Sequence, residues 1–203
     1  MQAREEFFIT TKVNPHEHGY DNTLAGVQES LRRLQLQHVD LLLVHSPMPF
    51  NRGIKFGFVP VEPCQGDESD IRLDTWRACE ECLRRGWAKS IGVSNFGEHH
   101  LDELLRHAEL APSVNQVEVS PFNQRRDLVA YCAERGIHVQ AWASLTQGQQ
   151  LRPRKNEPWP EDFAKAKNRT DKDGISSVLQ QVAQEARCSA VSDCPARSTE
   201  QWR

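Results

Sequence analysis

Short aliphatic runs recur along the chain, and each run ends in a polar or amphipathic residue. In the clearest of them, residues 41–44 are all aliphatic, His45 follows directly, and Pro47 stops regular strand pairing. A run of this length between turn signals is typical of a strand buried on both faces, as in a parallel sheet, although periodicity alone does not exclude a short buried helix. If it is a strand, His45 lies at its carboxyl end, where parallel α/β folds carry their active sites.

Segments with helical spacing separate these runs. The predicted strands are residues 7–11, 41–44, 90–94, 114–119 and 137–142. The first predicted helix follows a cap at Asp21 or Asn22, and the second begins at Asp74. The others surround Leu101 and cover residues 127–135 and 177–187, with long loops over 46–70 and 149–174. Regular alternation of this kind favours the α/β class, with a parallel sheet and right-handed crossovers.

Composition narrows the class of protein. The 203 residues suffice for one hydrophobic core, and 25 basic against 28 acidic side chains give a net charge of -3 without any basic block. This balance argues against nucleic-acid binding, and no apolar run approaches the roughly 18 residues of a membrane span. Six cysteines without a secretion signal indicate reduced thiols and a cytoplasmic location.

Polar and aromatic residues stand at the ends of successive predicted strands, namely Lys12, His45, Ser94, Asn95, Gln116 and Trp142. Because parallel strands end at the same edge of a sheet, these side chains are expected to gather there. Each has a structural interpretation when taken alone: a solvated strand end, a satisfied histidine, a helix cap or a core tryptophan. Their occurrence together favours a site.

Five segments in this order resemble the aldo-keto reductase family of NADPH-dependent carbonyl reductases. They are residues 8–12, 40–45, 89–96, 115–118 and 140–145, each on or beside a predicted strand. The resemblance implies an incomplete (β/α)8 TIM barrel over residues 1–187, with about five of the eight strand-helix units. Residues 188–203 form a divergent tail.

The resemblance also implies an NADP-dependent oxidoreductase that transfers hydride from NADPH to a small-molecule aldehyde or ketone. Lys12 matches the lysine that lowers the pKa of the family's proton-donating tyrosine, and His45 matches the histidine that orients the carbonyl. The other matched positions concern NADPH/NADP binding: Ser94, Asn95 and Gln116 at the nicotinamide carboxamide, Trp142 stacked on the ring, and Leu145 and Gln147 near the pyrophosphate.

The chain departs from the family pattern at both ends. It begins at the family's third strand, so the loops that carry the catalytic aspartate and tyrosine have no counterpart, and neither Tyr20, placed on a loop, nor Tyr131, placed in a helix, matches. The eighth-strand motif for the 2′-phosphate is also absent. The alternative is therefore a catalytically weak or inactive barrel fragment, either a nucleotide-binding or a subunit-pairing module. Its exposed edge strands would favour self-association.

Two further patterns raise the possibility of metal or redox chemistry. Cys79 and Cys82 are three residues apart on a predicted helix, without a second pair, and are expected to pack against the sheet. His16 and His18 are expected to be exposed loop residues, and His99 and His100 exposed residues at a helix start. No metal site is therefore predicted.

Overall fold

The computed structural model describes residues 4–49, 67–120 and 123–144. It divides into two compact units, one comprising Met1–Val117 with Ala130–Gln140 and the other Glu118–Val129 with Ala141–Arg203. The predicted helix over 177–187, the loop over 149–174, the tail from 188, Leu145 and Gln147 all lie outside the described residues.

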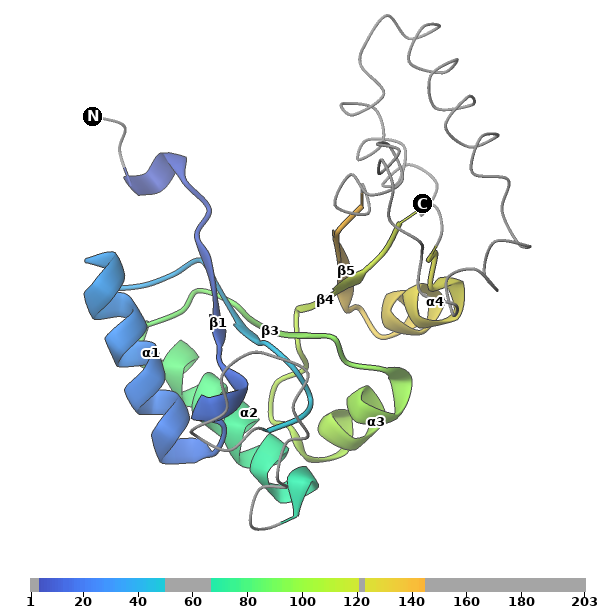
Figure 1. Ribbon diagram of the computed structural model, residues 1–203, viewed down its shortest axis with the longest axis horizontal. Helices are drawn as coiled ribbons and strands as arrows, with labels where there is room; N and C mark the ends of the chain where they lie inside the picture. The colour runs from blue at the N-terminus through green and yellow to red at the C-terminus, as the bar shows by residue number, and fades with distance from the viewer. Residues whose placement is uncertain (1–3, 50–66, 121–122, 145–203) are drawn as a thin grey trace, which may run out of the picture. The chain divides into compact units, whose positions relative to one another are not determined.

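The described residues form a five-stranded sheet whose strands follow chain order (Figure 1). The strands are β1 (Thr10–Val13), β2 (Leu41–Val44), β3 (Ile91–Ser94), β4 (Val114–Glu118) and β5 (His138–Trp142). The helices are α1 (Tyr20–Leu34), α2 (Glu68–Arg84), α3 (Glu98–His107) and α4 (Arg126–Glu134), with 3-10 turns η1 (Arg4–Glu6) and η2 (Pro15–Glu17). Strands β1 to β4 pair in parallel, which confirms the predicted α/β class.

The first strand, β1, starts later than the aromatic and β-branched residues 7–11 predict. Phe7 and Phe8 were expected inside it, yet they precede it and are 48% and 72% exposed. The N–H of Ile9 donates to the side chain of Asp40 (2.8 Å), so this end of the segment is held by a carboxylate. Lys12 consequently lies within β1, one residue before its end, rather than after it.

Two helices also begin earlier than predicted. The side chain of Asp67 accepts the N–H of Ser69 (2.8 Å), and this N-cap starts α2 at Glu68 rather than at Asp74. Tyr20 is the first residue of α1, so its placement on a loop was wrong. Tyr131 lies in α4, as predicted.

The core of the first unit is apolar and contains the free cysteines Cys79 and Cys82. All four residues of β2 are buried, and Trp76 of α2 is buried with its indole N–H donating to the carbonyl of Leu110 (3.0 Å). Cys79 and Cys82 are fully buried, which confirms their packing role. Burial raises the pKa of Cys82 to about 12 and that of Cys79 well above its usual value, so both thiols stay protonated.

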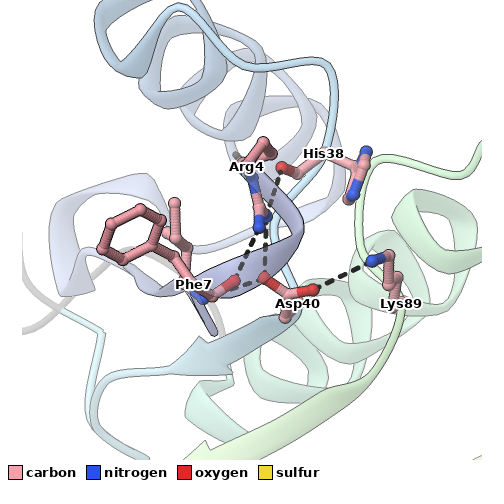
Figure 2. A network of polar contacts seen from close by, with 6 residues as sticks. Arg4, Phe7, His38, Asp40 and Lys89 are labelled. Atoms are coloured by element: carbon pink, nitrogen blue, oxygen red, sulfur yellow. Dashed lines mark hydrogen bonds and ion pairs between the residues drawn. The ribbon is translucent and has the colours of Figure 1, made fainter. Parts of the chain in front are cut away.

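Asp40 joins the amino ends of the first three strands, as Figure 2 shows. Besides the Ile9 N–H, its carboxylate binds the guanidinium of Arg4 (2.7 Å) and the ammonium of Lys89 (3.0 Å). These three donors hold the pKa of Asp40 well below its usual range. Arg4 also donates to the carbonyl of Phe7 (2.7 Å), so this cluster fixes the segment that enters β1. It lies at the end of the sheet away from His45.

Candidate active site

The carboxyl ends of β1 to β4 place the predicted polar side chains on one face of the sheet. Side chains along a strand alternate between faces, so residues that are aligned across neighbouring strands share a face. The pairs that fix this alignment are Lys12 with Leu43, Val44 with Val93, and Ser94 with Gln116. Lys12 and the positions of His45, Ser94 and Gln116 therefore lie on a common face.

Lys12 and His45 influence each other electrostatically. Burial lowers the pKa of the half-buried Lys12. Burial also lowers the pKa of His45 below its usual 6.5, and the positive charge of Lys12 lowers it further. His45 is therefore a neutral imidazole near neutral pH, and such a ring can donate one N–H to a carbonyl oxygen.

Asn95 connects the ends of β2 and β3. Its side-chain amide donates to the carbonyl of His45 (2.9 Å) and to the hydroxyl of Ser94 (3.1 Å). Its backbone is left-handed, with φ of 63°, a conformation that asparagine tolerates better than most residues, and its N–H donates to the carbonyl of Gln116 (3.0 Å). Since the N–H of His45 donates to Val13 (3.2 Å), both backbone polar groups of His45 are bonded.

Ser94 and Gln116 continue this hydrogen-bond network. Ser94 is 1% exposed and its hydroxyl donates to the carbonyl of Gln116 (2.9 Å), so its proton is used within the protein. The side-chain nitrogen of Gln116 donates to the side chain of Gln140 (2.8 Å), which directs the remaining oxygen of Gln116 as an acceptor. Asn95 and Gln116 are therefore the more accessible polar pair.

A buried asparagine, for which the sequence patterns predict no role, supports the Asn95 turn. Asn115 is fully buried, and its side-chain amide donates to the carbonyl of Phe96 (2.9 Å). This bond holds the residue that follows Asn95. The signal available in the sequence was an asparagine at a position that shares one strand face with Val117 and Val119. Such a buried amide needs a specific partner.

Trp142 belongs to the second unit. It ends β5, its carbonyl accepts the N–H of Val119 (3.3 Å), and it is 37% exposed. Its interpretation as a core tryptophan is therefore wrong, whereas its role as a stacking residue stays a prediction.

His18 is buried, so its assignment as an exposed loop residue was wrong. It is 6% exposed, and neither ring nitrogen has a hydrogen-bond partner among the described residues. Burial, followed by the charges of Arg72, His16 and His45, lowers the pKa of His18 to about 4. The next residue explains the burial, because the N–H of Gly19 donates to the hydroxyl of Thr75 on α2 (2.8 Å) and draws this loop inward.

His16 lies in η2 and is half-buried rather than exposed, whereas His99 and His100 lie in α3. His99 is exposed, as predicted, but His100 is half-buried and its ring accepts the N–H of Gly97 (3.2 Å). Among residues 4–49, 67–120 and 123–144, no group of three or more histidine, cysteine, aspartate or glutamate side chains could hold a metal ion. Over the same residues, no helix is long and apolar enough to cross a bilayer.

The chain is similar to reductases over most of its length. The model of the Aldo/keto reductase family matches residues 1–196. Glyoxal reductase of Bacillus subtilis is 44% identical over 149 residues, which are 73% of this chain and 47% of the relative. D-galacturonate reductase of Fragaria ananassa is 39% identical over 145 residues, or 71% of this chain and 44% of the relative. The chain thus spans about half the length of the curated relatives it matches.

Solved structures of reductases share the fold. An aldo/keto reductase from Brucella melitensis superposes with a TM-score of 0.73 at 27% identity, covering 100% of this chain and 62% of that one. A Bombyx mori aldo-keto reductase in complex with NADP gives a TM-score of 0.74 at 29% identity, covering 95% of this chain and 55% of that one. The described sheet corresponds to part of a larger barrel.

Proposed function

Because this chain belongs to the aldo/keto reductase family, we propose that it carries the nicotinamide end of an NADPH-dependent reductase of aldehydes and ketones. The observation that supports the proposal best is the common sheet face of Lys12, His45, Ser94 and Gln116. Its substrate is a small-molecule carbonyl compound. The cofactor is inferred from relatives, among them the Bombyx mori reductase in complex with NADP.

The exposed polar groups fit a nicotinamide carboxamide. This group has one oxygen that accepts and one NH₂ that donates hydrogen bonds. The side-chain oxygen of Gln116, which accepts no hydrogen bond from the described residues, would accept from the NH₂. One hydrogen of the Asn95 amide would turn from Ser94 to the carboxamide oxygen. NADPH bound there would supply hydride to the carbonyl carbon.

His45 would orient the substrate. Its neutral imidazole would donate an N–H to the carbonyl oxygen, and the nearby charge of Lys12 would favour the negative charge that develops on this oxygen. The proton that this oxygen takes up would come from solvent water. Tyr131 is poorly suited to supply it, because its hydroxyl bonds Asp102 and burial together with that bond raises the pKa of Tyr131 to about 12.

The second candidate is a binding module with little or no turnover. The sheet edge formed by β1 favours this candidate. Strand β1 pairs with β2 on one side only among the described residues, and exposed Phe7 and Phe8 precede it. Such an edge is a template for another strand, so self-association is part of this candidate. A cytoplasmic location fits both candidates, since Cys79, Cys82 and Cys132 are free thiols.

One titration separates the two candidates. NADPH is added to the purified full chain while tryptophan fluorescence is followed, and a reactive aldehyde is then added while NADPH absorbance is followed. Binding with turnover that His45→Gln lowers by about 10²-fold or more supports the reductase. Binding without turnover supports a nucleotide-binding module. Absence of binding contradicts the reductase and the nucleotide-binding module, and leaves only a subunit-pairing module.

A further inference from the structure

The residues after His45 are held by a side chain from α2. Arg72 donates from Nη1 to the carbonyl of Pro47 (3.0 Å), two residues beyond His45. Asn95 holds the carbonyl of His45 itself (2.9 Å). The chain leaving β2 is thus bonded from two different elements, although only Asn95 belongs to the predicted site.

Arg72 is itself fixed by α3. Its Nη2 donates to Glu103 (2.7 Å), and the two side chains are only 10% and 19% exposed. Ser69 donates its hydroxyl to the same carboxylate. The rigid guanidinium reaches Pro47 and Glu103 at once because its donors lie in one plane, whereas a lysine would offer a single ammonium on a flexible stem.

The surroundings of Arg72 include the loop after β1. The charge of Arg72 acts on buried His18, and His18 is also within electrostatic reach of His45. On the side of α3, the same charge acts on His100. Arg72 therefore lies among the segments that follow β1, β2 and β3.

We propose that Arg72 is a positioning residue for His45, acting through the carbonyl of Pro47 while Glu103 holds the guanidinium in place. The catalytic consequence rests on the proposed function, but the positioning itself does not. A purely stabilising ion pair would change the melting temperature and leave the His45 ring where it is. A positioning residue moves that ring in a chain that remains folded.

The test compares Arg72→Lys with Arg77→Met in the full chain. Arg77 is a matched control, since it lies on the same helix and forms an exposed ion pair with Asp74 (3.0 Å). The imidazole resonances of His45 are assigned by their loss in His45→Gln and are then recorded by NMR in each variant. We expect them to shift in Arg72→Lys and to remain unchanged in Arg77→Met.

Kinetics provide the second measurement. If the wild-type chain reduces a reactive aldehyde, Arg72→Lys should lower kcat by about 10- to 100-fold while the Kd for NADPH changes less than about twofold. If the wild-type chain shows no turnover, the proposed function is contradicted. The NMR comparison still decides whether Arg72 positions His45. Unchanged His45 resonances in folded Arg72→Lys overturn the proposal. If that variant does not fold, Glu103→Gln takes its place, and unchanged His45 resonances there overturn it equally.

Discussion

Histidines that are close together in this chain differ strongly in how deeply they are buried. His16 and His18 are two residues apart in one short segment, yet His18 is 6% exposed and unpaired among the described residues. No apolar spacing around it indicates this, because the burial comes from the distant contact of Gly19 with Thr75. Asn115 and Arg72 are similar cases, since their partners Phe96 and Pro47 lie on other elements.

His18 makes stability depend on pH. Its folded pKa of about 4 lies below the usual 6.5, so the unfolded chain takes up the proton first as the pH falls. The stabilisation is complete above pH 6.5 and is lost progressively towards pH 4. Between pH 7 and pH 5 the free energy of unfolding should fall by about 2 kcal/mol more in the wild type than in His18→Leu.

Urea unfolding at the two pH values measures this difference. His16→Leu is the matched control and should keep the wild-type pH dependence, and other titrating groups such as His100 are present in all three chains. An equal loss of stability in wild type and His18→Leu would contradict a neutral, buried His18.

At the scale of elements, apolar runs and helical spacing predict which elements exist but not where each begins. Strand β2 is predicted correctly because its four aliphatic residues are buried on both faces. The predicted start of β1 is wrong because the N–H of Ile9, which was expected to pair within a strand, donates to the side chain of Asp40. These two residues are 31 positions apart in the sequence. The predicted start of α2 is wrong because its cap, Asp67, follows a stretch of sequence without helical periodicity.

The Asp40 cluster should stabilise the amino ends of three strands. Asp40→Asn removes the charge that Arg4 and Lys89 share, so thermal unfolding at pH 7 should shift to lower temperature. Because the folded pKa of Asp40 is lowered, its contribution exists above the usual value of 3.8 and is lost as the pH falls through the folded pKa. The difference in Tm should therefore narrow below about pH 4.

Asp74→Asn is the control for this prediction, because Asp74 pairs with Arg77 on the exposed face of α2. Pairs of that kind contribute little, so its Tm should stay close to the wild-type value. Equal shifts for the two substitutions would mean that the Asp40 cluster has no special role.

At the scale of the whole molecule, strand-helix alternation suffices to predict the parallel α/β fold, although it does not distinguish a barrel from an open sheet with another strand order. It also predicts that Lys12, His45, Ser94 and Gln116 share one edge, because parallel strands end together. The contacts that hold this edge in place join segments far apart in the sequence. Local patterns do not encode such contacts. The proposed boundary near residue 187 stays a prediction.

The β1 edge leads to a prediction about association. If this edge pairs with a second copy of the chain, Phe8 lies close to the contact, since it is 72% exposed and lies two residues before β1. Phe8→Lys should then shift the chain towards the monomer in sedimentation velocity, because charges on edge strands oppose pairing. Leu110→Lys, at a residue that is 44% exposed away from this edge, should leave association unchanged. A wild-type chain that is monomeric at all concentrations would contradict the pairing.

The central claim is that the strand ends bind nicotinamide through Gln116, and the Kd for NADPH in three chains tests it most directly. Gln116→Met removes the proposed acceptor, whereas Gln140→Met removes only the neighbouring amide that Gln116 contacts. We expect the wild type to bind NADPH, Gln116→Met to bind about tenfold more weakly, and Gln140→Met to lose less affinity. Equal affinity of the wild type and Gln116→Met, or no binding by the wild type, would contradict the claim.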